Sequence, residues 1–178
     1  MSDTIFHIMT GGTIGGCVPE YPEIMKLADI FRDPIDFSKY IELSFKLRAT
    51  YQDQKVCHKD SRDITDADRA YIGEVIVEQY KKGVRKFLIT HGTYTMPETG
   101  TYLINHLPVD VAKGTTIIIT GSIFPWNVIG SDAPMNLGAA LAILVNTPQP
   151  GVSICMHGQL FDPHSVKKNE KELLFEKI

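Results

Sequence analysis

Residues 84–107 read VRKFLITHGTYTMPETGTYLINHL, and this stretch contains one complete strand, loop and helix. Val84–Thr90 is rich in apolar and β-branched residues, as a buried strand requires. The spacing Thr95-x-x-Glu98, with Pro97 in the first turn, predicts a capping box at the start of a helix. The apolar face of that helix is expected at Leu103, Ile104 and Leu107. One strand feeding one helix indicates a βα unit.

The same arrangement recurs on both sides of this unit. Further apolar runs predict strands at 4–10, 115–120 and 152–157, and helical spacing predicts helices over about 65–82 and 134–146. Strands that alternate with helices of this length are typical of parallel sheets with right-handed crossovers. The sequence therefore predicts an α/β fold with one doubly wound, mostly parallel sheet flanked by helices, of the Rossmann-like or flavodoxin-like kind.

Three segments depart from this pattern. Residues 41–52 alternate strictly between apolar and polar, which predicts a half-exposed strand near a sheet edge. The loop at about 14–23 and the charged tail at 160–178 are candidates for lids over the site. No internal repeat or linker marks a boundary, and 178 residues match one domain, so we expect 1–178 to be a single domain with no second one.

Composition narrows the class of partner. The net charge is −3 and the pI is about 6.0, so the chain has no positive field that would attract nucleic acid or an anionic membrane. A small molecule is the expected ligand. The three cysteines form no C-x-x-C pair and the N-terminus lacks a basic signal region, so we expect a cytoplasmic protein.

Glycine followed by a hydroxyl residue ends three of the predicted strands. The segments are Thr10-Gly11-Gly12-Thr13, Thr90-His91-Gly92-Thr93-Tyr94-Thr95 and Thr120-Gly121-Ser122. The carboxyl ends of parallel strands meet at one edge of a sheet, where ligands bind. Each segment alone is compatible with an ordinary turn, whereas three together favour a hydroxyl site for acyl transfer.

A threonine nucleophile needs a base, and a desolvated lysine can act as one. Lys167 and Lys168 follow the last predicted strand closely enough to return to this edge, although both could also be solvated tail residues. His91 and His157 lack metal-ligand spacing, so no metal site is expected. Residues 11–16 read GGTIGG, which fits neither a P-loop nor a dinucleotide fingerprint.

Taken together, these motifs resemble the bacterial-type L-asparaginase family, and specifically its amino-terminal domain. The family motifs T-G-G-T-I, D-S-R-D-[IM]-T, H-G-T-D-T and V-x-K-[NT] have counterparts here as TGGTI at 10–14, DSRDIT at 60–65, HGTYT at 91–95 and VKKN at 166–169. The segments 121–122 and 131–137 resemble the family's stretch that opens the next helix. The resemblance spans nearly the whole chain.

The resemblance implies a role for several residues. Thr13 would be the nucleophile that attacks the side-chain amide of L-asparagine, with no metal or organic cofactor. Thr93 would form the second hydroxyl group with Lys168 as its proton acceptor, since Lys167 precedes the V-x-K position. In the same way, Asp60 and Ser61 would hold the substrate carboxylate, and Tyr21 would be the lid tyrosine that assists the nucleophile.

Two departures from the family pattern bear on function. Typical members are about twice as long, so the site here would be closed by the tail, the lid or another copy, and a homo-oligomer is expected by analogy. Tyr94 replaces the aspartate that binds the substrate ammonium, which predicts weakened activity. The alternative function is a small amino-acid-binding sensor or pseudoenzyme on the same fold.

Overall fold

A six-stranded sheet forms the centre of the fold in the computed structural model, which describes residues 3–16, 37, 41 and 46–178. The order across the sheet is β2-β1-β3-β4-β5-β6, with β1 to β5 parallel and β6 antiparallel to β5. The strands are β1 (Thr4–Gly11), β2 (Thr50–Lys59), β3 (Lys86–Thr90), β4 (Thr116–Thr120), β5 (Gly151–Met156) and β6 (Gln159–Phe161). The fold class predicted from the apolar runs is confirmed.

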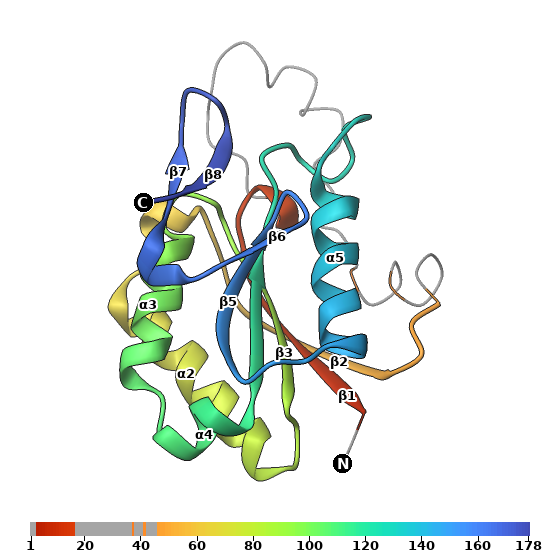
Figure 1. The fold of residues 1–178 in the computed structure, drawn as a ribbon, viewed down its shortest axis with the longest axis vertical. Coiled ribbons are helices and arrows are strands. Elements are labelled where there is room, and N and C mark those ends of the chain that lie inside the picture. The colour runs from red at the N-terminus through yellow and green to blue at the C-terminus, as the bar shows by residue number, and fades with distance from the viewer. Residues whose placement is uncertain (1–2, 17–36, 38–40, 42–45) are drawn as a thin grey trace.

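Helices cover both faces of the sheet. They are α2 (Asp66–Lys81), α3 (Met96–His106), α4 (Val109–Gly114) and α5 (Ala133–Asn146), with α5 on the face opposite the other three (Figure 1). Two buried cores match the two faces, because alternate strand residues point to opposite sides: Phe6 and Ile8 pack toward α2 and α3, whereas Ile5 packs toward α5. None of the described helices has the length and apolarity that a membrane crossing needs.

The start of the edge strand differs from the prediction. The alternation at 41–52 predicts a strand there, but β2 begins at Thr50, and part of the predicted range (42–45) lies outside the described residues. The reason is register: Thr50 pairs with Thr4 at the beginning of β1, so earlier residues have no β1 residue to pair with. Lys46 also has a positive φ of 50°. The edge position itself is as predicted.

The predicted capping box at Thr95 is wrong. Thr95 is the N-cap of α3, but its side chain makes no capping hydrogen bond. Its hydroxyl donates instead to the carbonyl oxygen of Ser61, at 2.6 Å. Thr65 behaves as predicted, since it forms a complete capping box with Asp68 at the start of α2. A contact with a distant loop has therefore replaced the local cap at Thr95.

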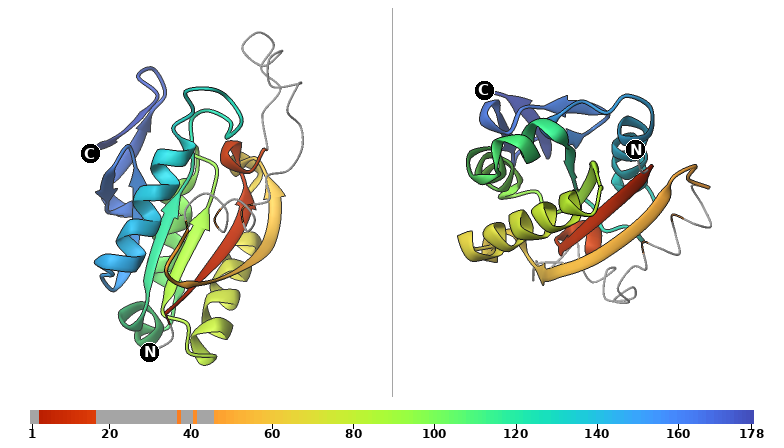
Figure 2. Two further views of the ribbon diagram at one scale, coloured as in Figure 1. Left: turned by 90° about the vertical axis from the view of Figure 1, so that its right-hand side faces the viewer. Right: turned by 90° about the horizontal axis from the view of Figure 1, so that it is seen from below.

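The charged tail forms a hairpin rather than an open coil. A short 3-10 helix at Pro163–Ser165 leads into β7 (Val166–Asn169) and β8 (Leu174–Lys177), which pair antiparallel. Figure 1 and the left view of Figure 2 both place this hairpin at the end of the molecule where the parallel strands finish. The tail thus brings its lysines to the carboxyl edge of the sheet.

Candidate active site

The loop after β1 depends on glycine. Gly12 has φ 70° and ψ −179°, a backbone region that is essentially restricted to glycine. A Cβ on Gly12 would lie 2.4 Å from the backbone nitrogen of Gly92, so the loops after β1 and β3 touch backbone to backbone. This conformation starts the 3-10 turn Thr13–Gly15 and leaves the side chain of Thr13 partly exposed.

Thr13 and Thr93 therefore follow two glycines that are in contact. β1 and β3 are neighbours in the strand order 2-1-3-4-5, and the order reverses direction between them, which makes this position the switch point where α/β sheets bind ligands. Within the described part of the chain, the Thr13 hydroxyl makes no hydrogen bond. The first glycine–hydroxyl motif thus presents an accessible hydroxyl at the expected edge.

The loop after β2 reaches the same place. A Cβ on Gly92 would lie 2.7 Å from the side chain of Ser61, so this glycine also allows close contact. The Ser61 hydroxyl is buried and accepts hydrogen bonds from the backbone N–H of Tyr94 at 3.1 Å and of Thr95 at 3.4 Å. Because these two bonds use only the oxygen lone pairs, the O–H of Ser61 can still donate a hydrogen bond. Ser61 thus fixes the loop after β3.

The hairpin brings one lysine into this group. The Lys168 Nζ donates to the Thr93 Oγ1 at 2.9 Å, across 75 residues of sequence. Burial lowers the pKa of Lys168; the charges of Glu170 and Asp60 oppose this shift and that of Arg62 adds to it. A lysine with a lowered pKa bonded to a hydroxyl is suited to proton transfer.

The neighbouring lysine has a different environment. Lys167 lies on the same strand with an exposed side chain, and its Nζ is 3.3 Å from the Glu176 carboxylate on β8. Successive strand residues point to opposite sides, so only one of the pair can face Thr93. The structure brings Lys168 to that position and leaves Lys167 in solvent.

Two cationic side chains lie near the ring of Tyr94. The Lys168 Nζ is 3.7 Å from the centroid of the Tyr94 ring, and the Arg62 Cζ is 4.7 Å from it. The sequence assigns no role to Arg62, although it belongs to the DSRDIT motif, and it is the main addition that the structure makes to this cluster. An aromatic face attracts cations through its quadrupole.

Asp60 is committed to Arg62. Its carboxylate accepts from the Arg62 Nε at 2.9 Å, from the Nη2 at 3.2 Å and from the backbone N–H at 2.9 Å. Burial opposes ionisation of Asp60, but the hydrogen bonds from Arg62 outweigh it, so the pKa of Asp60 is lowered. Asp60 is therefore a carboxylate already paired within the cluster.

His91 is fully buried and stabilises the loop after β3. Its Nδ1 lies 2.7 Å from the Gly92 carbonyl oxygen and its Nε2 lies 2.9 Å from the Thr99 hydroxyl. Burial lowers the pKa of His91 to about 4. A neutral ring with its proton on Nδ1 donates to Gly92 and accepts from Thr99, so His91 shapes the loop that carries Thr93.

The remaining predicted residues have other positions. The buried Ser122 hydroxyl donates to the Phe124 carbonyl at 2.6 Å, which gives the third glycine–hydroxyl motif a turn function. Tyr21 and most of the predicted lid at 14–23 lie outside the described residues. Within the described residues, no group of three His, Cys, Asp or Glu side chains could hold a metal ion.

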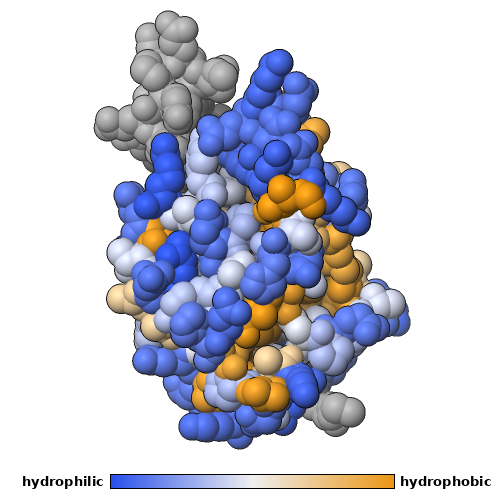
Figure 3. Space-filling model, turned by 60° about the vertical axis from the view of Figure 1, so that its left-hand side comes forward, coloured by the Kyte–Doolittle hydropathy of each residue, from blue (hydrophilic) through white to orange (hydrophobic). Residues whose placement is uncertain are grey.

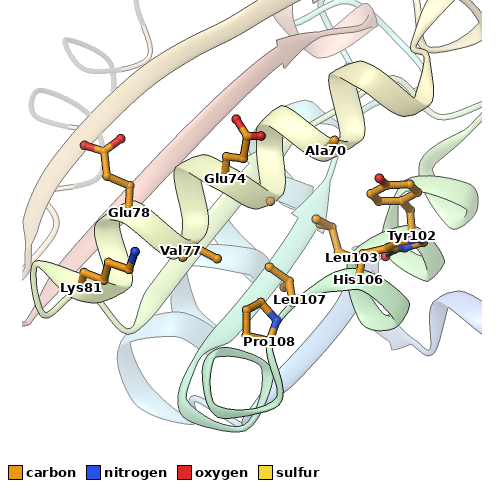
Figure 4. Close-up of a pocket in the computed structure, with 11 residues that line it drawn as sticks. Ala70, Glu74, Val77, Glu78, Lys81, Tyr102, Leu103, His106, Leu107 and Pro108 are labelled. Atoms are coloured by element: carbon orange, nitrogen blue, oxygen red, sulfur yellow. Dashed lines mark hydrogen bonds between the residues drawn. The ribbon is translucent and has the colours of Figure 1, made fainter.

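A separate groove lies between α2 and the segment from α3 to Pro108. It encloses about 480 Å³, and Val77, Leu103 and Leu107 line it (Figure 4). Figure 3 shows apolar surface among charged side chains on the side of the molecule where α3 lies. The groove contains none of the strand-end residues described above, so it is not the hydroxyl site.

The family model and the curated relatives that match this chain both belong to the asparaginases. The family described as "Asparaginase, N-terminal" matches residues 4–174. A Schizosaccharomyces pombe protein named probable L-asparaginase 4 is 32% identical over 151 residues, which cover 83% of this chain and 40% of that protein. The chain thus spans less than half the length of this relative.

Solved structures share the fold. The probable cytoplasmic L-asparaginase of Campylobacter jejuni superposes with a TM-score of 0.81 at 24% identity. The superposed region covers 99% of this chain and 53% of the Campylobacter jejuni chain. L-asparaginase I of Vibrio cholerae superposes with a TM-score of 0.79 at 25% identity, over 99% of this chain and 52% of the Vibrio cholerae chain. In each case, this chain corresponds to about half of the solved protein.

Proposed function

This chain belongs to the asparaginase family, and from that membership we propose that it is an amidohydrolase that cleaves a side-chain amide through a threonine acyl-enzyme. The observation that carries the proposal is the 2.9 Å hydrogen bond from the Lys168 Nζ to the Thr93 Oγ1 at the switch point of the sheet. L-Asparagine, the substrate implied by the family, is the first amide to test.

In the proposed reaction, the Thr13 Oγ1 attacks the amide carbon and an acyl ester forms while ammonia leaves. Water then attacks the ester, which restores Thr13 and releases the acid. Lys168 accepts and returns a proton through Thr93, since its lowered pKa brings the neutral amine closer to working pH. Asp60 and Ser61 would orient the carboxylate end of the substrate.

Further parts of the proposal concern the lid, the tail, the location and the assembly of the chain. Tyr21 is proposed as the assisting tyrosine on family resemblance alone. Closure of the site by the tail is supported by the position of β7, which carries Lys168. A cytoplasmic location and a homo-oligomer are proposed by analogy, and the name of the Campylobacter jejuni protein agrees with the former.

The test measures ammonia release from L-asparagine and from L-glutamine. We expect Thr13→Ala to lower kcat/KM by at least about 10³-fold, because no other group replaces a lost nucleophile. Thr101→Ala is the matched control, since Thr101 is a half-buried threonine on α3 away from the strand ends. Activity that survives Thr13→Ala would contradict the proposed nucleophile.

A second pair of variants tests the proton acceptor. Lys168→Met should lower kcat/KM by about 10²–10⁴-fold, the usual contribution of a general base, whereas Lys167→Met should leave it near the wild-type value. If no variant, wild type included, releases ammonia but amino acids raise the melting temperature, the binding-sensor alternative is favoured.

A further inference from the structure

The Lys168 amine is in contact with two adjacent residues of the loop after β3. Its Nζ donates to the Thr93 Oγ1 at 2.9 Å and lies 3.7 Å from the centroid of the Tyr94 ring. Because an aromatic face attracts an ammonium group, the ring acts on the same nitrogen that binds the hydroxyl. Thr93 is buried and Tyr94 is half-buried, so both contacts are partly shielded from solvent.

Carboxylates do not account for the position of this amine. Asp60 receives three hydrogen bonds from Arg62, so its oxygens are already committed. Glu170 acts on Lys168 by its charge, but it is exposed where the chain turns between β7 and β8. A lysine side chain is long and flexible, and one hydrogen bond leaves it several alternative rotamers. The ring of Tyr94 is the second contact that limits them.

The turn after β2 fixes the ring of Tyr94 in its turn. The Arg62 Cζ lies 4.7 Å from the ring centroid, and Asp60 holds this guanidinium in place. The backbone N–H of Tyr94 also donates to the buried Ser61 hydroxyl at 3.1 Å. Both contacts come from one short 3-10 turn, Ser61–Asp63. The ring is therefore a fixed surface against which the flexible lysine packs.

We propose that Tyr94 is a positioning residue whose ring holds the Lys168 Nζ at the Thr93 hydroxyl. The inference rests on the proposed hydrolase function, in which this amine exchanges a proton with Thr93. The alternative is that Tyr94 only lacks the charge of the aspartate found in the family motif. Positioning requires an aromatic face and no phenol hydroxyl, whereas under the alternative all uncharged side chains at position 94 are equivalent.

Two uncharged substitutions at position 94 distinguish these explanations by their kinetics with L-asparagine. Tyr94→Phe keeps the ring and should keep kcat within about threefold of the wild-type value. Tyr94→Leu removes the aromatic face and should lower kcat about tenfold with KM changed less than about twofold, because a displaced amine impairs proton transfer rather than substrate binding. Equal kcat values for the two variants would overturn the inference.

Tyr102→Leu is the matched control for removal of an aromatic ring. Tyr102 is a half-buried tyrosine on α3 that stacks on His106, and it lines the groove away from the strand ends. Both kinetic constants should stay near the wild-type values in this variant. Should Tyr94→Leu fail to fold, Tyr94→Met takes its place, because an unbranched side chain adapts to irregular space.

An NMR measurement reports the position of the amine without any turnover. Protons over the face of an aromatic ring are shifted upfield, so the ε-methylene protons of Lys168 should resonate upfield of those of the exposed Lys167. This shift should persist in Tyr94→Phe and disappear in Tyr94→Leu, and Lys168→Met assigns the signal. Identical shifts for the two lysines of the wild type would overturn the inference.

The two measurements separate failure of this inference from failure of the proposed function. If the wild type releases no ammonia but the Lys168 shift depends on the ring, the positioning contact is supported and the hydrolase is refuted. If ammonia is released at the same rate by Tyr94→Leu and Tyr94→Phe, the hydrolase is supported and the positioning role is refuted.

Discussion

Gly92 is the residue on which the convergence of the loops depends most directly. Its backbone touches Gly12 from the β1 loop, and the space where a side chain would stand is filled by Ser61 from the β2 loop. Three strand ends are thereby brought together within van der Waals distance. Because Thr93 follows Gly92 directly, the close packing of the loops and the proposed chemistry depend on two adjacent residues.

Substitution of Gly92 should therefore be costly. We expect Gly92→Ala to reduce the free energy of unfolding by about 2–3 kcal/mol, because a Cβ would lie 2.7 Å from the Ser61 side chain. Gly15→Ala is the matched control, since a Cβ on Gly15 would meet nothing within 4 Å and the stability should change by less than about 1 kcal/mol. Urea unfolding of both variants measures the difference. Equal losses would mean that crowding at Gly92 relaxes easily.

At the scale of elements, the junction between β2 and α2 sets the loop that carries Asp60 and Ser61. Asp68 accepts from the Lys59 Nζ at 2.7 and 2.8 Å, at the end of β2, and from the Thr65 N–H at 2.8 Å. One carboxylate thus ties the last residue of the strand to the cap of the helix. The loop between them has little freedom.

Removal of this carboxylate should destabilise the junction. Asp68→Ala is expected to lower the free energy of unfolding by about 1–2 kcal/mol through loss of the cap. Its hydrogen bond to Lys59 leads the causes that lower the pKa of Asp68 to about 2, so the loss should be full at neutral pH and fade below about pH 4. Asp66→Ala, at an exposed position in the same turn, should cost under about 0.5 kcal/mol. Thermal unfolding at about pH 7 and pH 3 checks both variants.

At the scale of the whole molecule, two fully buried histidines stand within the sheet region. His7 lies between the Tyr51 and Thr90 hydroxyls, and its pKa is lowered to about 3 by burial. His91 has its pKa lowered to about 4 in the same way. Both rings remain neutral in the folded chain while the unfolded chain takes up protons below about pH 6.5.

Stability should therefore fall on mild acidification. Between about pH 6.5 and 5.0 the two histidines together should remove about 3 kcal/mol from the free energy of unfolding. His58, whose pKa is lowered first by burial and then by Lys55, acts in the same direction. His7→Gln should reduce the pH dependence by about half of that amount whatever its effect at neutral pH. Urea titrations across this pH range measure the slope, and an unchanged slope would rule out His7 as a contributor.

The fold could be predicted largely because the buried parallel strands are continuous apolar runs in the sequence. Polar elements were harder: β2 extends through TYQDQKVCHK, and the β7 strand reads VKKN, so neither shows the apolar pattern of a central strand. Their pairing is decided by distant residues, such as Thr4 opposite Thr50. The capping box at Thr95 is wrong for the same reason, because the Thr95 hydroxyl bonds to Ser61, a residue 34 positions away that local spacing does not reveal.

The candidate site likewise contains residues that local motifs predict and residues that only long-range contacts identify. Glycine–hydroxyl motifs, which are local, suggest Thr13 and Thr93. The choice of Lys168 depends on family resemblance, because no spacing rule reveals which face of a polar hairpin strand turns inward. The proximity of Arg62 and Lys168 to the Tyr94 ring is visible only in the structure, because Arg62 comes from the turn after β2 and Lys168 comes from β7.

The contact between Lys168 and Thr93 also has a consequence for biosynthesis. The two glycine loops leave the ribosome early, whereas the lysine is translated 75 residues after Thr93. A nascent chain therefore displays its hydroxyls without the amine that would activate them. The proposed chemistry switches on only after translation has passed Lys168 and the hairpin has closed back onto the sheet.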